Sequence, residues 1–162
     1  MTGHRRAPVR VLLVDNQPDF LESIRFWLTS KGYQVMTAKS GEQALRVIKT
    51  GRPNLVLLDI MMPEMDGIET LRRIRALSKT LPVIIVTTAF DDGNRFAGAR
   101  ALGIAGLFTK SGSLTEFHRM LEGALATRRA DGSTAREGAL SQRWFDVVTA
   151  WLRKIRDACA GR

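Results

Sequence analysis

The chain has 162 residues, of which 44% are hydrophobic and 25% charged, and its formal net charge is +9 at pH 7. This length suits one ordinary domain of a globular protein. No apolar tract is long enough to span a bilayer, and the basic residues 1–10 lack the apolar segment of a secretory signal. The lone Cys159 cannot form an internal disulfide, so a cytoplasmic location is expected.

Strand and helix patterns alternate along the sequence. Uncharged apolar runs predict strands near residues 9–14, 34–37, 54–58, 82–87 and 105–108. Apolar residues at helical spacing predict helices near residues 18–30, 41–49, 67–77, 92–102 and 113–127. This strict alternation predicts an α/β fold, with a doubly wound five-stranded parallel sheet and right-handed crossovers.

Polar residues stand where four of these strands end. Asp15 ends the first strand, Asp59 ends the third, and Thr88 and Lys110 follow the fourth and fifth. Because parallel strands bring their carboxyl ends to one edge of the sheet, these side chains are expected to share a pocket. Two carboxylates suit Mg²⁺, while a hydroxyl and an ammonium can hold other phosphoryl oxygens. Taken alone, Asp59 is better explained as a residue that caps the next turn, and the residues at the other three strand ends reverse this preference.

With these residues the chain resembles the receiver domain of two-component response regulators, including single-domain chemotaxis and sporulation-relay types, over residues 9–126. The resemblance implies the family's flavodoxin-like (βα)5 fold. It also implies that Asp59, in Leu-Leu-Asp-Ile-Met-Met-Pro-Glu-Met-Asp-Gly, accepts a phosphoryl group from a sensor histidine kinase or phosphotransfer protein, and that Lys110 pairs with that group. The positions implied to hold Mg²⁺ are Asp15, Asn16, Asp59 and the backbone carbonyl of Met61.

The family's switch hydroxyl has two candidates in this sequence. Counting back from Lys110 selects Thr88, whereas counting forward from Pro82 selects Thr87. Thr88 is preferred because the Thr-Ala-Phe-Asp-Asp that begins there follows the family's pattern after the strand. Thr87 is kept as the alternate.

The sequence departs from the family pattern at several positions. Asn16 replaces the second acid, and Gln17 stands where Glu is common, which removes negative charge from the metal site. Leu107 takes the place of the usual switch aromatic, and Ser111 that of a common proline. These changes favour, as an alternative function, a degenerate receiver that binds proteins without needing phosphate.

Both ends of the chain extend beyond the resemblance and carry most of its net positive charge. Residues 1–8 form a basic tail, residues 127–139 have the polar, small composition of a linker, and residues 140–158 predict an amphipathic helix. Its apolar side includes Trp144, Val148, Trp151 and Ile155. Such a helix needs a partner, which is the receiver itself, a second copy in a homodimer, another protein or a membrane surface.

The favoured function is a phosphorylatable receiver that is not an enzyme in the ordinary sense and that signals to a downstream protein. A DNA-associated regulator that uses the basic ends is less favoured, because the tail is too short for a typical helix-turn-helix domain. Nucleotide binding is disfavoured because no Gly-rich phosphate loop is present. His4 and His118 lie too far apart in sequence and context to suggest a metal pair or a catalytic triad.

Overall fold

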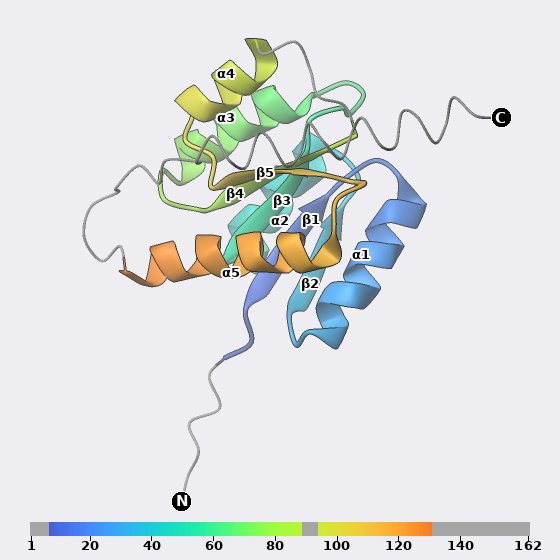
Figure 1. The fold of residues 1–162 in the computed structure, drawn as a ribbon. Helices are drawn as coiled ribbons and strands as arrows, with labels where there is room; N and C mark the ends of the chain where they lie inside the picture. Colours follow the sequence, from blue (N-terminus) through green and yellow to red (C-terminus); the bar gives the residue numbers. More distant parts are fainter. Residues whose placement is uncertain (1–6, 89–93, 131–162) are drawn as a thin grey trace, which may run out of the picture. The chain divides into compact units, whose positions relative to one another are not determined.

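The chain was analysed as a computed structural model, which describes residues 7–88 and 94–130. Five strands alternate with five helices in this part of the chain (Figure 1). The elements are β1 (Arg10–Val14), α1 (Pro18–Ser30), β2 (Gln34–Ala38), α2 (Gly41–Gly51), β3 (Leu55–Asp59), α3 (Gly67–Leu77), β4 (Val83–Thr87), α4 (Asn94–Ala101), β5 (Gly106–Thr109) and α5 (Leu114–Ala130).

The strands form one parallel sheet in the order β2-β1-β3-β4-β5. Helices α1 and α5 cover one face of the sheet, and α2, α3 and α4 cover the other (Figure 1). This arrangement confirms the predicted doubly wound, flavodoxin-like fold. Because β1 and β3 lie side by side at its centre, the chain changes direction across the sheet there, and ligands of such folds bind outside the carboxyl ends of these strands.

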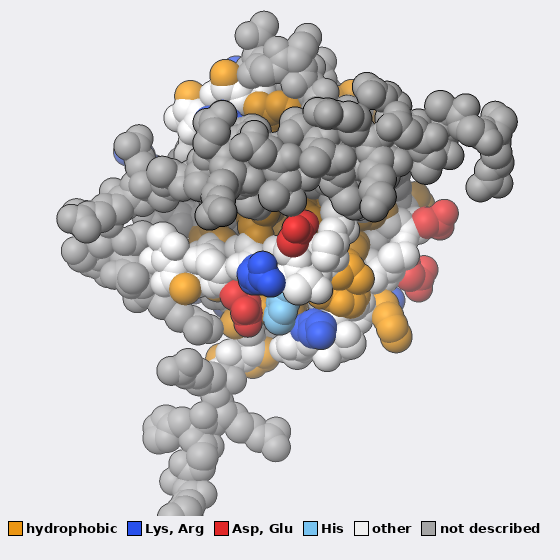
Figure 2. Space-filling view, viewed as in Figure 1, with side chains coloured by type: hydrophobic (Ala, Val, Ile, Leu, Met, Phe, Trp, Pro, Cys, Tyr) orange, Lys and Arg blue, Asp and Glu red, His pale blue; other side chains and the backbone are white. Residues whose placement is uncertain are grey.

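The sheet is buried between two hydrophobic clusters, one on each face. Every residue of β3 and β4 is buried, as their uncharged sequences predict. Side chains alternate along β3, so that Leu55 and Leu57 pack under α1 and α5 whereas Val56 and Leu58 pack under α2, α3 and α4. On the surface that includes α5, basic and acidic side chains are interspersed (Figure 2).

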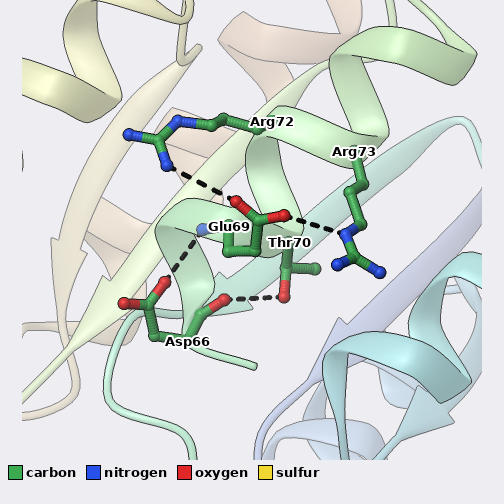
Figure 3. Close-up of polar contacts among 5 residues, drawn as sticks. All are labelled: Asp66, Glu69, Thr70, Arg72 and Arg73. Carbon is green, nitrogen blue, oxygen red and sulfur yellow. Dashed lines mark hydrogen bonds and ion pairs between the residues drawn. The ribbon is translucent and has the colours of Figure 1, made fainter. Parts of the chain in front are cut away.

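Polar contacts fix the start of α3, the helix that follows the third strand. The carboxylate of Asp66 accepts a hydrogen bond from the backbone nitrogen of Glu69 at 2.8 Å, and the Thr70 hydroxyl donates to the Asp66 carbonyl at 2.7 Å (Figure 3). Glu69 in turn pairs with Arg73 at 2.9 Å and Arg72 at 3.4 Å. An Asp at this position supplies an acceptor for the otherwise unpaired first amides of the helix.

The half-buried Arg75, at the other end of α3, joins two loops. Its guanidinium donates to the carbonyls of Leu81 (2.8 Å), Leu102 (2.8 Å) and Gly103 (2.5 Å). Burial lowers the pKa of this guanidinium. The contacts therefore fasten the end of α4 to the segment that leads into β4.

Helix α5 ends at Ala130, so residues 127–130, which the sequence assigned to a linker, are helical. The Arg128 guanidinium donates to the carbonyls of Pro53 (3.3 Å) and Asn54 (2.8 Å), which gives this last turn a tertiary anchor. The rest of that linker, the predicted helix at 140–158 and residues 1–6 of the basic tail lie outside the described residues. No helix in the described ranges is long and apolar enough to cross a membrane.

Candidate functional site

The ends of β1, β3 and β5 bring three charged side chains together. Val14 pairs with Leu58, so Asp15 and Asp59 lie at the same level on neighbouring strands. The ammonium of Lys110, which follows β5, reaches across β4 and lies 2.6 Å from Asp15 Oδ2 and 2.8 Å from Asp59 Oδ2. The structure thus unites three of the residues that the sequence assigned to one pocket.

The loops after β1 and β3 hold the second oxygen of each carboxylate. The backbone nitrogen of Gln17 donates to Asp15 Oδ1 at 2.8 Å, and that of Met61 donates to Asp59 Oδ1 at 3.0 Å. Both are contacts of an aspartate with the amide two residues later, which is a common way for a short loop to fix a carboxylate. Each aspartate therefore has one oxygen held by its loop and one facing Lys110.

The three charged side chains are buried, and burial has the largest effect on the ionisation of Asp15. The side chains of Asp15 and Asp59 are 1% and 3% exposed, and that of Lys110 is 8% exposed. Burial raises the pKa of Asp15, the neighbouring Asp59 charge acts in the same direction, and the nearby Lys110 ammonium and the hydrogen bond from the Gln17 amide oppose both. Removing a carboxylate from water disfavours its charged form, and this effect outweighs the nearby ammonium.

The pocket suits a small divalent cation. Although Asp15 Oδ2 lies close to the ammonium, it is buried and accepts no hydrogen bond of good geometry from the described residues. Such an oxygen has spare capacity for a metal. No third acidic, His or Cys side chain joins the two carboxylates in the part of the chain that the structure describes, and Mg²⁺ needs only one or two carboxylates alongside waters and phosphate oxygens.

The remaining predicted metal positions lie at the rim. Asn16 is exposed between the buried Asp15 and the first residues of α1. The Met61 side chain points outward and is 51% exposed, while its backbone approaches the Asp59 carboxylate. These positions are compatible with an amide oxygen and a backbone carbonyl at the pocket mouth, and their metal-binding role stays a prediction.

The sheet register bears on the two threonine candidates. Thr87 is buried and pairs with Thr109, and its carbonyl accepts from the Lys110 amide at 2.8 Å. Thr88, which is exposed, comes next along the chain, just as Lys110 follows Thr109. Because side chains alternate along a strand, Thr88 shares the face of Asp59 and Lys110 whereas Thr87 belongs to the opposite face. The position therefore favours Thr88, and its role as a switch stays a prediction.

The departures at the fifth strand affect packing on both faces. Leu107 is buried in the cluster under α2, α3 and α4. Phe108 is buried on the other face, where its ring stacks on Phe117 with centroids 4.4 Å apart. The aromatic ring next to the expected switch position is thus part of the core beneath α5.

Two contacts with Lys110 at the pocket were not predicted from sequence. The Gln17 side-chain oxygen accepts a hydrogen bond from Lys110 Nζ at 3.0 Å, and the Phe20 ring lies under the same ammonium, 4.6 Å from it to the centroid. Both belong to the start of α1, one turn after Asp15. Their closeness to Asp15 in sequence was the one available sign that they lie near the pocket. Their contact with Lys110, which follows β5, depends on the folded sheet.

The family model of the response regulator receiver domain matches residues 11–122. The chain belongs to this family. Response regulator MprA of Mycolicibacterium vanbaalenii is 34% identical to it over 134 residues, which cover 83% of this chain and 58% of that protein. A receiver domain of this kind is not an enzyme in the ordinary sense.

Solved structures of other receivers share the fold. The chemotaxis protein CheY4 of Vibrio cholerae matches 72% of this chain and 98% of its own length, with a TM-score of 0.68 and 27% identity. A CheY-like receiver domain protein from Methanospirillum hungatei JF-1 matches 77% of this chain and 99% of its own length, with a TM-score of 0.74 and 24% identity. At this identity the similarity shows the fold alone. This receiver thus spans nearly all of those two chains but only 58% of the length of the MprA protein.

Proposed function

We propose that this receiver accepts a phosphoryl group on Asp59 from a phosphohistidine of a sensor histidine kinase or phosphotransfer protein. The observation that carries the proposal is the buried Asp59 carboxylate beside Asp15, with Lys110 Nζ 2.8 Å from its Oδ2. An ammonium fixed beside an acceptor oxygen can stabilise the negative charge of an incoming phosphoryl group. The downstream partner in this proposal is a protein, and the site of action is the cytoplasm.

Transfer forms a bond between an Asp59 carboxylate oxygen and phosphorus and breaks the phosphorus–nitrogen bond of the donor imidazole. The Met61 amide holds Asp59 Oδ1, which orients the carboxylate for attack. Lys110 then exchanges its contact with Asp59 Oδ2 for one with a phosphoryl oxygen. Bound Mg²⁺ would neutralise phosphoryl charge, and the residues that would hold it are Asp15, Asp59, Asn16 and the Met61 carbonyl.

The signal would pass from the pocket to the surface that α4, β5 and α5 form. Phosphorylation adds charge and acceptor oxygens at the sheet edge. In our proposal, these oxygens draw Thr88 and Lys110 inward and so bias the neighbouring helices. A homodimer through residues 140–158, which lie outside the described residues, remains a further proposed output.

A second candidate is a receiver that binds its partner without phosphate. One observation favours it: the residues at 16 and 17 are amides, so that among the described residues the pocket contains two carboxylates against one ammonium. A site with less negative charge binds a divalent cation more weakly. Weak cation binding would in turn slow phosphoryl transfer.

Intact-mass measurement after incubation with acetyl phosphate and Mg²⁺ separates the two candidates. We expect the mass of one phosphoryl group to be added, and we expect Asp59→Asn to abolish this gain. Asp66→Asn is the matched control, because it makes the same change at the exposed cap of α3 and retains a good capping residue. No mass gain in the native chain, together with no spectral response to beryllofluoride, would reject phosphorylation and favour the second candidate.

A further inference from the structure

Gln17 is the N-cap residue of α1, yet its side chain does not cap the helix. It has extended backbone angles, its carbonyl accepts from the Leu21 amide at 3.1 Å, and Pro18 follows it directly. Its side chain makes no capping hydrogen bond with the helix. The side-chain oxygen instead accepts from Lys110 Nζ, 93 residues away in sequence.

The backbone of Gln17 is anchored to the same pocket. Its amide donates to Asp15 Oδ1 at 2.8 Å, so that one residue contacts both a pocket carboxylate and the ammonium. A lysine ammonium has three protons and no acceptor. The oxygens around it come from Asp15, Asp59 and Gln17, and the Phe20 ring covers another side.

Gln17 is the uncharged member of these three oxygen partners. Asp15, Asp59 and Lys110 together have a formal charge of −1, and an amide oxygen at position 17 leaves this value unchanged. A glutamate there, which is common in the family, would make it −2. The amide therefore holds the ammonium without adding a negative charge.

We propose that Gln17 is a positioning residue that keeps the Lys110 ammonium at the pocket mouth, within reach of a phosphoryl group on Asp59. When Lys110 exchanges its Asp59 contact for a phosphoryl oxygen, the contact with Gln17 persists and restrains the long lysine chain. The consequence for phosphoryl binding rests on the proposed function. The lysine contact itself is present in the unphosphorylated protein and can be tested there.

Gln17→Ser separates positioning from a structural role. Serine is too short to reach the ammonium, but it is among the preferred residues at a helix start, so the melting temperature should hold or rise. In the full chain we expect the Lys110 side-chain ammonium resonance to shift. With Mg²⁺ present, beryllofluoride should bind roughly tenfold more weakly, because a hydrogen bond to a charged group is lost.

Two further variants complete the test. Gln17→Glu keeps an oxygen at the same reach and should keep the lysine contact, while Gln34→Ser, on the exposed start of β2, should change neither readout. An unchanged Lys110 resonance in Gln17→Ser overturns the proposal, as does unchanged beryllofluoride affinity with a lowered melting temperature. If the native chain binds no beryllofluoride, the proposed function fails. The Lys110 resonance then decides alone whether Gln17 holds the lysine.

Discussion

Replacing Gly67 by alanine should destabilise the receiver and disturb its acceptor residue. Gly67 begins α3, and its amide donates to the Ile60 carbonyl at 3.0 Å. A Cβ atom there would meet the Asp59 carbonyl oxygen, the Asp59 carbonyl carbon at 3.0 Å and the Ile60 Cα at 2.6 Å. All three are backbone atoms, so no side-chain rotation can relieve the contact.

The expected cost follows from these contacts. Overpacking usually costs about 1–3 kcal/mol, and a clash with backbone atoms belongs at about the upper limit. Alanine regains about 0.5–1 kcal/mol over glycine in a helix. The net loss is therefore about 2 kcal/mol, which lowers the melting temperature by roughly 8 °C for a domain of this size. Because Asp59 must shift with its carbonyl, beryllofluoride binding should weaken as well.

Urea unfolding and thermal melting measure the first effect, and beryllofluoride titration measures the second. Gly123→Ala is the matched control: this glycine lies inside α5, and its added Cβ would meet nothing within 4 Å. That variant should gain about 0.5–1 kcal/mol. A Gly67→Ala protein that melts at or above the native temperature would refute the reasoning.

Four other predictions concern metal binding, loss of the phosphoryl group, the protonation of Asp15 and the contacts of Arg75. Asn16→Asp should tighten Mg²⁺ binding by restoring a carboxylate, and an unchanged titration would remove this residue from the site. Met61 and Phe90 are apolar and cannot orient an attacking water, so we expect the phosphoryl group to be lost slowly by hydrolysis. Met61→Asn or Phe90→Lys should speed this hydrolysis. A half-life of seconds for the phosphorylated native chain would contradict the expectation. Burial raises the pKa of Asp15 above its ordinary value of 3.8, so the native fold binds this proton more tightly than the unfolded chain does. The stability that protonated Asp15 contributes is thus present below that value and is lost as pH rises through the raised pKa. In urea unfolding, the free energy of unfolding of Asp15→Asn should therefore fall less over this pH range than that of the native chain. Arg75→Met should cost about 3 kcal/mol in urea unfolding, because several carbonyls, most of them part-buried, lose their donor, and Arg75→Lys should not restore it fully.

The acid and ammonium positions could be predicted from sequence because they depend on one rule. A charged residue that ends an apolar parallel strand must lie at the carboxyl edge, which is enough to unite Asp15, Asp59 and Lys110. The preference for Thr88 over Thr87 depends on register, since a shift of one residue changes the face of the sheet. The sequence favours Thr88 through the family's pattern, with Thr87 as the alternate, and the pairing with β5 adds the physical reason for Thr88.

Contacts made by long side chains could not be predicted in this way. The contact of Gln17 with Lys110 and the contacts of Arg75 with the carbonyls of Leu102 and Gly103 join segments that are far apart in sequence. The end of α5 is a similar case, because its polar last turn suggests a linker, yet Arg128 finds carbonyl partners at the start of β3. In each case a tertiary partner decides what local composition does not.

The strand order also makes ligand binding a measure of complete folding. Asp15 comes from β1, Asp59 from β3 and Lys110 from β5, and β4 lies between the last two. A partly folded chain without β5 lacks the ammonium, however well its other strands pair. A pocket ligand at a hundred times its dissociation constant should therefore add about 2.7 kcal/mol to the state with these four strands assembled. Edge strand β2 contributes no side chain to this group, but the carbonyl of Ala38 at its end accepts from the Asp15 amide at 3.0 Å.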